Sequence, residues 1–338
     1  MLKPDTRKAR TDGISPVERL HTLVAADMAA TDRMIHARMG SGVALIPDLA
    51  RHLIDSGGKR LRPMLTLAAA QMGGYTGDRH VNLAAAVEFI HTATLLHDDV
   101  VDASTLRRGK VAANLVWGNK ATVLVGDFLF SRAFQLMVET GSLRVLDILA
   151  GASAIIAEGE VMQLKSESNL GTTEEHYLKV VGAKTAALFS AAAEAGATLC
   201  ARGPEFIAAL RAYGDNLGIA FQLVDDALDY SGRQALMGKA VGDDFREAKV
   251  TLPVILAYAR ADRQAELFWK RVIEGGPQGE ADLERAITCV EETGAIRETM
   301  DRARRYADHA IAALGPLPHS DIKSALADIA DFCVERAY

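Results

Sequence analysis

Two short acidic clusters with identical spacing, each set in apolar sequence, constrain this chain more than any other feature. They are Asp98-Asp99-Val100-Val101-Asp102 and Asp225-Asp226-Ala227-Leu228-Asp229. The apolar spacing before each cluster predicts helices over about 79–102 and 205–230. Because residues three and four apart share one face of a helix, the carboxylates of each cluster are expected to lie close together. Any fold of this chain must therefore bring cations to both helix ends.

Grouped carboxylates repel one another and are costly to desolvate unless a cation binds them. Oxygen-only clusters of this kind suit Mg²⁺, which prefers carboxylates, water and substrate phosphates. One such cluster is a weak signal, because acidic triplets also cap helices or pair with arginines such as Arg107 and Arg108. A matched pair is much harder to obtain by chance, and two clusters facing one cavity would clamp a diphosphate. We therefore expect Mg²⁺ at Asp98, Asp99, Asp102, Asp225, Asp226 and Asp229.

The composition favours one all-α domain over residues 1–338, although the length alone would permit two domains. Apolar residues make up 49% of the chain and only 9 prolines interrupt it. Segments with the period-two alternation of strands are absent, and further helices are expected over 113–138 and 150–167. Such a chain can bury a large core around a deep cavity. Residues 1–14 lack the apolar core of a signal peptide, and we expect them to be disordered. We expect the polar segment 231–250 to form a mobile loop over a site.

Charge and cysteine usage narrow the class of partner and the compartment. The net charge is −6 with both signs interspersed, and no basic stripe is present, which argues against nucleic acid. The three cysteines (Cys200, Cys289 and Cys333) are far apart, so we interpret them as small hydrophobes of a reducing compartment and expect a cytoplasmic protein. Apolar stretches such as 81–96 contain polar residues and are short, so no transmembrane helix is expected.

Several basic segments could bind anions. Gly57-Gly58-Lys59-Arg60-Leu61-Arg62-Pro63 combines three cations with flexible backbone amides at a predicted helix break. Taken alone, such a segment is more often a solvated loop. Lys184-Thr185 stands in an Ala-rich helix, where a lysine either extends its amine to solvent or binds an anion. Lys239 and Lys249 flank the polar loop and would by themselves be ordinary surface lysines.

Together these segments resemble the trans-prenyltransferase (polyprenyl diphosphate synthase) family from about residue 40 to residue 338. The matching motifs are GGKRLRP at 57–63, HDDVVDASTLRRGK at 97–110, GDFL at 126–129, KT at 184–185, FQLVDDALDY at 221–230 and GDDFREAKVTLP at 242–253. The resemblance implies an orthogonal helical bundle of the isoprenoid synthase type around a deep central cavity. It also implies a homodimer and three Mg²⁺ ions per substrate-bound site.

The resemblance also implies a role for each matching residue. The six aspartates would hold Mg²⁺ ions that bridge an allylic diphosphate. Residues expected to contact that diphosphate are Arg107, Lys184, Lys239 and Lys249, with Thr185 and Gln222 lining the reaction centre. Residues expected to bind isopentenyl diphosphate are Gly58, Lys59, Arg62, His91 and Arg108. Without the resemblance, His91 would be interpreted as a core histidine. Ala248 departs from the family, which commonly has Gly there, and is expected to stiffen the loop slightly.

The implied reaction needs no protein nucleophile, which agrees with the lack of a Ser/His/Asp or Cys/His set. Metal ions would stabilise the departing diphosphate while an allylic cation forms in a dry cavity. The isopentenyl double bond would attack C1 of that cation, and a proton would then leave C2 of the added unit. The family assigns the released diphosphate as the base.

The residues one turn before the first cluster bear on product length. At a rise of about 1.5 Å per residue, Ala93 and Thr94 lie roughly 6–7.5 Å below Asp98. Short-chain members place bulky aromatics there, whereas both residues are small here. The sequence therefore predicts an open floor and C40–C50 products of eight to ten units, and predicts that Ala93→Phe shortens the product. Phe134, with Phe130 and Met137 at helical spacing, is a candidate for a deeper floor or a plain core residue.

Three alternatives stay open on the residues alone. A shorter-chain farnesyl or geranylgeranyl synthase would share every motif. A non-catalytic subunit of a heteromeric synthase would be expected to have lost acidic positions, whereas all six are present. A terpene cyclase would not need GGKRLRP and Arg108 as a second diphosphate site. The resemblance to long-chain synthases suggests a respiratory quinone, such as ubiquinone, as the destination of the product, and a transient membrane contact for its release.

Overall fold

The structure, a computed structural model, describes residues 14–231 and 242–335. Of the segment predicted to be disordered, 1–14, all but the last residue lies outside this part. The described chain up to residue 117 forms α1 (Pro16–Leu23), α2 (Ala25–Arg38), α3 (Leu45–Ile54), α4 (Leu61–Met72), α5 (Arg79–Val101), the short strands β1 (Leu106–Arg107) and β2 (Lys110–Val111), and α6 (Ala113–Trp117).

The remaining elements are also helical, and they complete the bundle. The middle of the chain forms α7 (Asn119–Glu139), α8 (Leu143–Ser166), α9 (Glu174–Val181), the π-helix η1 (Gly182–Ala186), α10 (Ala187–Thr198) and α11 (Pro204–Asp229). The C-terminal part forms α12 (Asp243–Arg246), α13 (Leu252–Ala259), α14 (Arg263–Ile273), α15 (Asp282–Glu292), α16 (Ala295–Ala313) and α17 (Asp321–Glu335).

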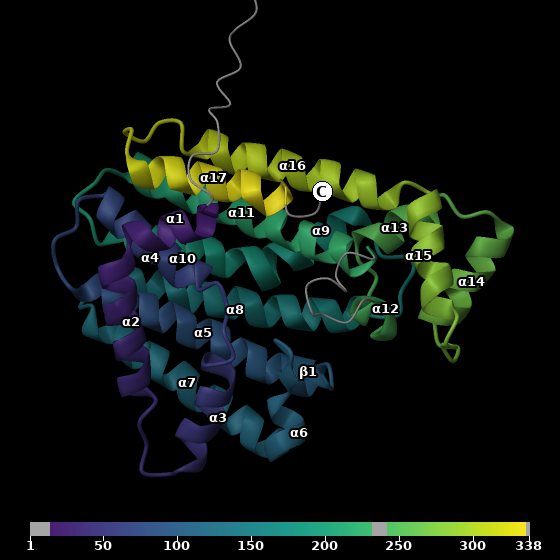
Figure 1. Cartoon of the computed structure of the whole chain (residues 1–338), viewed down its shortest axis with the longest axis horizontal. Coiled ribbons are helices and arrows are strands. Elements are labelled where there is room, and N and C mark those ends of the chain that lie inside the picture. Colours follow the sequence, from purple (N-terminus) through teal and green to yellow (C-terminus); the bar gives the residue numbers. More distant parts are fainter. Residues whose placement is uncertain (1–13, 232–241, 336–338) are drawn as a thin grey trace, which may run out of the picture.

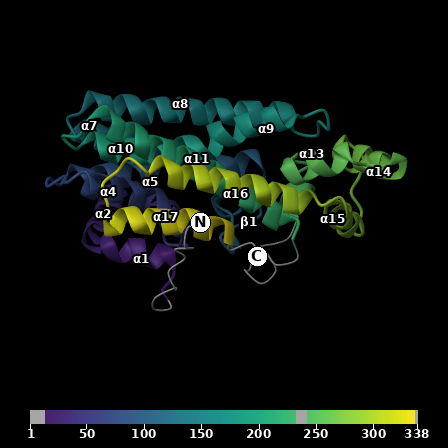
Figure 2. The same cartoon turned by 90° about the horizontal axis from the view of Figure 1, so that it is seen from above.

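The helices pack in layers around α10, which contacts α4, α8 and α11. α5 packs along α7, and α11 packs along α16. Figure 1 shows α16 and α17 along one side of the bundle, and Figures 1 and 2 both show α13, α14 and α15 at one end. The prediction of an all-α bundle is confirmed, with one two-stranded antiparallel hairpin added between α5 and α6.

The two helices that carry the acidic clusters are core helices. In α5, every residue from Leu83 to Ile90 is buried, as expected for a helix that is apolar on all sides. α11 lies very close to α10 at Gly214, where an added Cβ would be 2.4 Å from the carbonyl oxygen of Phe189. This contact with α10 helps to hold α11 in place along its length.

Side-chain caps set some helix ends, and two of the predicted helix boundaries differ from those in the structure. Ser15 caps α1 in a capping box with Glu18, and Thr173 caps α9 by accepting a hydrogen bond from the backbone N–H of His176. The helix predicted over 113–138 is broken at Gly118, whose φ of 80° suits glycine and ends α6 before α7 begins. The helix predicted from residue 150 begins earlier, at Leu143, after the cap Ser142.

α7 bears on the expectation that the chain has no membrane-spanning segment. Among the described residues, α7 is the one helix that is both long enough and apolar enough to cross a membrane. Within its most apolar stretch of 18 residues, 39% is buried inside the protein. A core helix of a soluble bundle passes the same test, and α7 packs along α5. Its outer face is nevertheless apolar, with Leu124 66% exposed and Val138 also exposed.

Candidate active site

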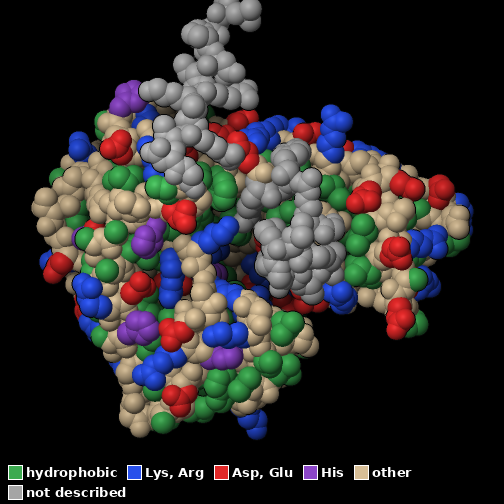
Figure 3. All heavy atoms as spheres, in the orientation of Figure 1, with side chains coloured by type: hydrophobic (Ala, Val, Ile, Leu, Met, Phe, Trp, Pro, Cys, Tyr) green, Lys and Arg blue, Asp and Glu red, His purple; other side chains and the backbone are tan. Residues whose placement is uncertain are grey.

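The C-terminal parts of α5 and α11 open onto two adjoining cavities. The larger, of about 550 Å³, has Asp98 and Asp225 in its wall together with Lys59, Arg62 and Arg108. The smaller, of about 280 Å³, is lined by Asp102, Asp225, Asp226 and Asp229 and by Arg107, Arg108 and Lys249. Figure 3 shows Lys and Arg side chains around a hollow in the middle of this face, with acidic side chains between them. The two acidic clusters thus meet across one site, as the sequence predicted.

Each carboxylate of the first cluster faces a cation from another segment. Asp98 lies 3.9 Å from the Lys184 amine, and Asp102 accepts a hydrogen bond of 3.0 Å from Lys249. Asp99 is fully buried and accepts a hydrogen bond of 2.7 Å from Arg107. Burial outweighs the nearby cations and raises the pKa of Asp98 to about 7. Asp99 lines neither cavity and anchors Arg107, whereas Asp98 lines the larger cavity and Asp102 the smaller one.

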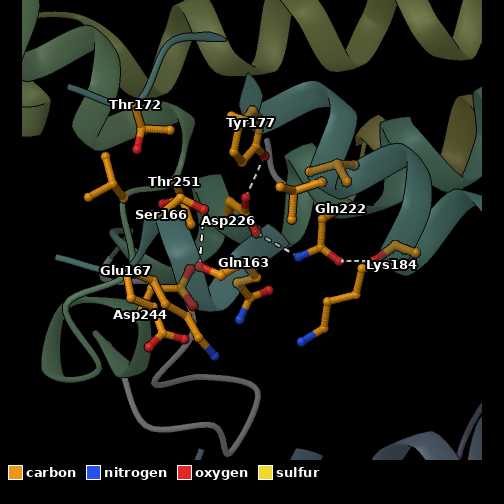
Figure 4. A pocket seen from close by; sticks show the side chains of 15 residues that line it. Gln163, Ser166, Glu167, Thr172, Tyr177, Lys184, Gln222, Asp226, Asp244 and Thr251 are labelled. Atoms are coloured by element: carbon orange, nitrogen blue, oxygen red, sulfur yellow. Dashed lines mark hydrogen bonds between the residues drawn. The ribbon is translucent and has the colours of Figure 1, made fainter. Parts of the chain in front are cut away.

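The second cluster is held by a hydrogen-bond network. Asp226 is buried and accepts hydrogen bonds from the Tyr177 hydroxyl and from Gln222 Nε2, and Figure 4 shows both side chains pointing at it. Asp229 accepts the backbone N–H groups of Asp243 and Asp244 at the start of α12. Burial raises the pKa of Asp226 to about 7 and that of Asp229 to about 6.

Lys184 and Thr185 lie on η1, where the helix is locally widened into a π-helix. Such bulges often occur at functional sites because they redirect side chains. Lys184 donates a hydrogen bond of 2.8 Å to Glu160 of α8, and Thr185 donates one of 2.8 Å to Gln222. The lysine that is unusual in an Ala-rich sequence therefore points toward Asp98, and the structure brings it to the acidic clusters.

The residues expected to bind isopentenyl diphosphate all line the larger cavity: Gly58, Lys59, Arg62, His91 and Arg108. The Arg62 guanidinium stacks on Phe189 with its Cζ 4.2 Å from the ring centroid. Its Nη1 lies 3.3 Å from His91 Nε2, and its Nε is buried with no hydrogen-bond partner. Burial and the neighbouring arginines lower the pKa of His91 well below 6.5. His91 is therefore neutral and can accept a hydrogen bond from Arg62.

The segment before α13 supplies one more cation. Lys249 forms ion pairs with Asp102 and Glu247. Ala248, just before it, has a φ of 51°, a left-handed conformation that costs a residue with a Cβ about 1–2 kcal/mol. The departure from glycine is therefore a source of backbone strain, beyond the slight stiffening expected. Lys239 and half of the loop expected over 231–250, residues 232–241, lie outside the described residues.

Of the three residues expected to set product length, Thr94 alone is in the cavity wall. It shares a face of α5 with His91, Leu95 and Asp98, all of which line the larger cavity. Ala93, one residue earlier, is fully buried in the core cluster that includes residues of α7 and α8. Phe134 of α7 is 37% exposed and packs against Phe130, with ring centroids 5.7 Å apart.

Three acidic or phenolic residues of the site were not predicted from the sequence. Tyr177 holds Asp226, Glu160 holds Lys184, and Glu88 pairs with Arg60 in the larger cavity. Of these, Glu88 carried a usable signal, because it is a charged residue within the apolar sequence before the first cluster. Tyr177 and Glu160 follow ordinary helical patterns and could not be singled out.

The donor set suits a hard divalent cation. Within the described ranges, no three acidic, His or Cys side chains already converge as they would around an ion; lysines and an arginine contact the first cluster instead. Five of the six aspartates nevertheless line adjoining cavities, and one Asp99 oxygen is buried with no hydrogen-bond partner. Crowded, buried carboxylates with raised pKa values become more stable as anions when a cation binds. The residues therefore fit an oxygen-coordinated metal.

Comparisons with known proteins agree with this geometry. Residues 43–290, more than half of the chain, match the family Polyprenyl synthetase. An octaprenyl diphosphate synthase of Escherichia coli (strain K12) is 45% identical over 320 residues, which is 95% of this chain and 99% of that protein.

Two crystal structures are similar over nearly the whole chain. A polyprenyl synthase from Caulobacter crescentus CB15, complexed with calcium and isoprenyl diphosphate, is 55% identical with a TM-score of 0.93, covering 98% of this chain and 100% of that chain. A decaprenyl diphosphate synthase from Rhodobacter capsulatus is 56% identical with a TM-score of 0.92, covering 96% of this chain and 100% of that chain. The resemblance found in the motifs is thereby confirmed: this chain belongs to the polyprenyl synthetase family of transferases, which has the all-α isoprenoid synthase fold.

Proposed function

We propose that this protein is a long-chain trans-prenyltransferase that adds isopentenyl diphosphate repeatedly, head to tail, to an allylic diphosphate such as farnesyl diphosphate. One observation carries the proposal. A single cavity has Asp98 and Asp225 in one part of its wall and the cations Lys59, Arg62 and Arg108 in another. Such a cavity can hold two diphosphates at once, one through metal and one directly.

The allylic diphosphate would lie between the acidic clusters. Three Mg²⁺ ions held there by the aspartates would neutralise the departing diphosphate and so favour its ionisation. Lys184, Lys249 and Arg107 now pair with Asp98, Asp102 and Asp99. Metal bound by Asp98 and Asp102 would leave Lys184 and Lys249 available to the diphosphate oxygens. Arg107, held by Asp99, lines both cavities, and Lys239 is proposed to join these cations. Calcium in the Caulobacter crescentus relative supports a divalent metal.

Isopentenyl diphosphate would bind at Gly58, Lys59, Arg62, His91 and Arg108. The buried Nε of Arg62, which lacks a hydrogen-bond partner, and the fork of Arg108 suit phosphate oxygens. The wall of the larger cavity also contains the apolar side chains Leu95, Ile156 and Phe221. Those side chains would exclude water from an allylic cation formed there. Thr185 and Gln222, which hydrogen-bond each other, line the same centre.

The product is proposed to be an all-trans C40–C50 chain. The relatives named octaprenyl and decaprenyl diphosphate synthase support this length, as does the small Thr94 in the cavity wall. We also propose that the product becomes a quinone side chain, that the enzyme works in the cytoplasm, and that transient membrane contact assists release. Buried Cys200 and Cys333 are consistent with small hydrophobes of a reducing compartment.

We propose a homodimer as the working state. The residues that support it are large hydrophobic side chains left exposed on α7 and α8, namely Val123, Leu124, Phe134, Val138, Leu143, Ile155, Val161 and Leu164. Exposed apolar surface of this extent on a soluble protein usually marks an interface. A second copy of the chain would cover it symmetrically.

The test is an elongation assay with purified protein, Mg²⁺, farnesyl diphosphate and labelled isopentenyl diphosphate, with products sized by chromatography. Products ending at eight to ten units are expected. Asp98→Asn and Asp225→Asn should abolish elongation, whereas Asp147→Asn on the exposed part of α8 should not. Products stopping at C15–C20 would retain the reaction and contradict the long-chain assignment. No elongation by the intact protein would favour a non-catalytic subunit.

A further inference from the structure

A buried glutamate lies among the cations of the larger cavity. Glu88 of α5 is 3% exposed and lies three residues before His91, in the wall of the same cavity. It forms an ion pair of 2.5 Å with Arg60 Nη1. A buried carboxylate is expensive unless it is paired, and neither Glu88 nor Arg60 has a part in the proposed reaction. The presence of this ion pair in the cavity wall therefore needs an explanation.

Arg60 joins three segments that shape the cationic end of the cavity. Its Nη1 pairs with α5 at Glu88, and its Nη2 donates a hydrogen bond of 3.2 Å to the carbonyl of Ile54 at the end of α3. Its own backbone has a φ of 49°, a left-handed conformation immediately before α4. Lys59, directly before Arg60, and Arg62, two residues after it, both line the larger cavity.

Arg108 is attached to the same place. It donates hydrogen bonds to the carbonyls of Leu53 and Gly57, at and just after the C-terminal end of α3. The carbonyl end of a helix attracts cations, so two guanidinium groups gather there. Burial and the neighbouring arginines lower the pKa of Arg62 and Arg108, and the negative charge of Glu88 opposes this shift.

We propose that Glu88 and Arg60 form a positioning pair for the isopentenyl diphosphate subsite. Glu88 fixes Arg60, and Arg60 fixes the 57–60 segment, so that Lys59, Arg62 and Arg108 converge before the substrate arrives. The inference rests on the proposed function, which assigns those three cations to isopentenyl diphosphate. Neither member of the pair needs to touch the substrate. Preorganisation of this kind lowers the free energy lost on ordering the site when the ligand binds.

The experiment measures kcat and separate KM values for isopentenyl and farnesyl diphosphate in Glu88→Gln, Arg60→Gln and the double variant. Each single variant should raise KM for isopentenyl diphosphate on the order of 10–100-fold, because small displacements of positioned groups have effects of this size. KM for farnesyl diphosphate should stay within about threefold. The double variant should resemble the singles, because each substitution already breaks the pair.

Two reference variants distinguish a wrongly placed substrate and a general loss of stability from a failure of the positioning pair. Arg108→Gln tests the assignment of the subsite: if its KM for isopentenyl diphosphate is unchanged, the proposed function has misplaced this substrate. Glu194→Gln removes another buried glutamate, 8% exposed on α10 and paired with Arg144 at 3.1 Å outside the cavity. It should lower Tm without changing either KM.

Three outcomes would overturn the positioning pair while Arg108→Gln behaves as expected. They are an unchanged KM in both single variants, an equal rise in both KM values together with a lower Tm, and additive effects in the double variant. If Glu88→Gln does not fold, Glu88→Asp keeps the charge and shortens the side chain by one methylene. It should still raise KM for isopentenyl diphosphate selectively, and an unchanged KM in a folded Glu88→Asp would equally contradict the proposal.

Discussion

At the scale of single residues, burial determines which groups of the site carry charge. Asp98 and Asp226 are carboxyls whose pKa is raised to about 7. Near neutral pH both the protonated and the ionised forms are therefore populated, and a bound cation would favour the ionised form. His91 is shifted in the opposite sense, toward the neutral form, by burial and by the surrounding arginines. The cavity thus keeps its acidic end ready for metal and its basic end free of a competing imidazolium.

The lowered pKa of His91 predicts a pH dependence of stability. Below its ordinary pKa of 6.5, unfolded His91 binds a proton and folded His91 does not. Falling pH therefore favours the unfolded state, by up to about 1.4 kcal/mol for each pH unit below 6.5 until the folded pKa is reached. His91→Gln removes this term, so its free energy of unfolding should fall less steeply than that of the wild type between pH 6.5 and 5. Denaturant unfolding at several pH values measures the difference, and parallel curves would show that His91 titrates normally.

Thr94→Phe should shorten the product. The residue is in the wall of the larger cavity, on the same face of α5 as His91, three residues before it, and Asp98, four residues after it. An aromatic ring there would block the growing chain. Products should shift from C40–C50 toward C15–C20 with the initial rate of condensation retained. Chromatography of the products measures this, and full-length product from a folded Thr94→Phe would show that the chain grows elsewhere.

Ala93→Phe, for which the sequence predicts the same shortening, becomes the matched comparison. Because Ala93 is fully buried in the core shared with α7 and α8, a Phe ring there must displace packed side chains, at a typical loss of about 1–3 kcal/mol. It shortens the product only if the growing chain passes through that core. The pair of variants therefore identifies the side of α5 that the chain follows.

At the scale of elements, the approach of α7 to α5 controls the first acidic cluster. Gly126, the first residue of the GDFL motif, lies against His97: an added Cβ would be 2.4 Å from His97 Nε2. Asp127, the next residue, lies 3.4 Å from the same ring nitrogen. Because His97 directly precedes Asp98, these contacts fix the position of the acidic cluster relative to α7. The GDFL motif therefore has a packing role: it holds the helix end that carries the first acidic cluster.

Gly126→Ala should lower the free energy of unfolding by about 1–3 kcal/mol through overpacking. Removing the ring in His97→Ala/Gly126→Ala should restore part of the loss, measured by chemical denaturation. Gly151→Ala in α8 is the control: no atom lies within 4 Å of its added Cβ, so it should stabilise by about 0.5–1 kcal/mol. If Gly126→Ala were as stable as Gly151→Ala, the His97 ring would be able to move away from the added methyl group without lowering the free energy of unfolding.

At the scale of the whole molecule, the exposed apolar face of α7 and α8 predicts self-association. Leu124→Glu places a charge on that face, where Leu124 is 66% exposed, and a charge buried without a partner disfavours an interface strongly. The variant should be monomeric by size-exclusion chromatography with light scattering, whereas the wild type is expected to be a dimer. Leu267→Glu, on α14 at 54% exposure, should remain dimeric. A monomeric wild type, or a dimeric Leu124→Glu, would contradict the proposed interface.

Much of the architecture could be predicted from the sequence because helices obey local rules. The spacing of apolar residues placed α5 and α11 to within one residue, and the repeated aspartates indicated a shared site. The signals were weaker at helix ends, where the conformation of Gly118 and the cap at Ser142 decided the boundaries. Residue spacing along one helix was also enough to place Thr94 near Asp98.

The sequence by itself determined which residues carry the chemistry, since their types, order and spacing are local properties of the chain. Only the tertiary structure decided their partners: Asp102 with Lys249, 147 positions away, Asp226 with Tyr177, and Glu88 with Arg60. It also decided that Asp99 and Ala93 face the core while Asp98 and Thr94 face the cavity. These outcomes depend on how closely and at what angle the helices cross, which is set by the packing of many side chains at once and by no single stretch of sequence.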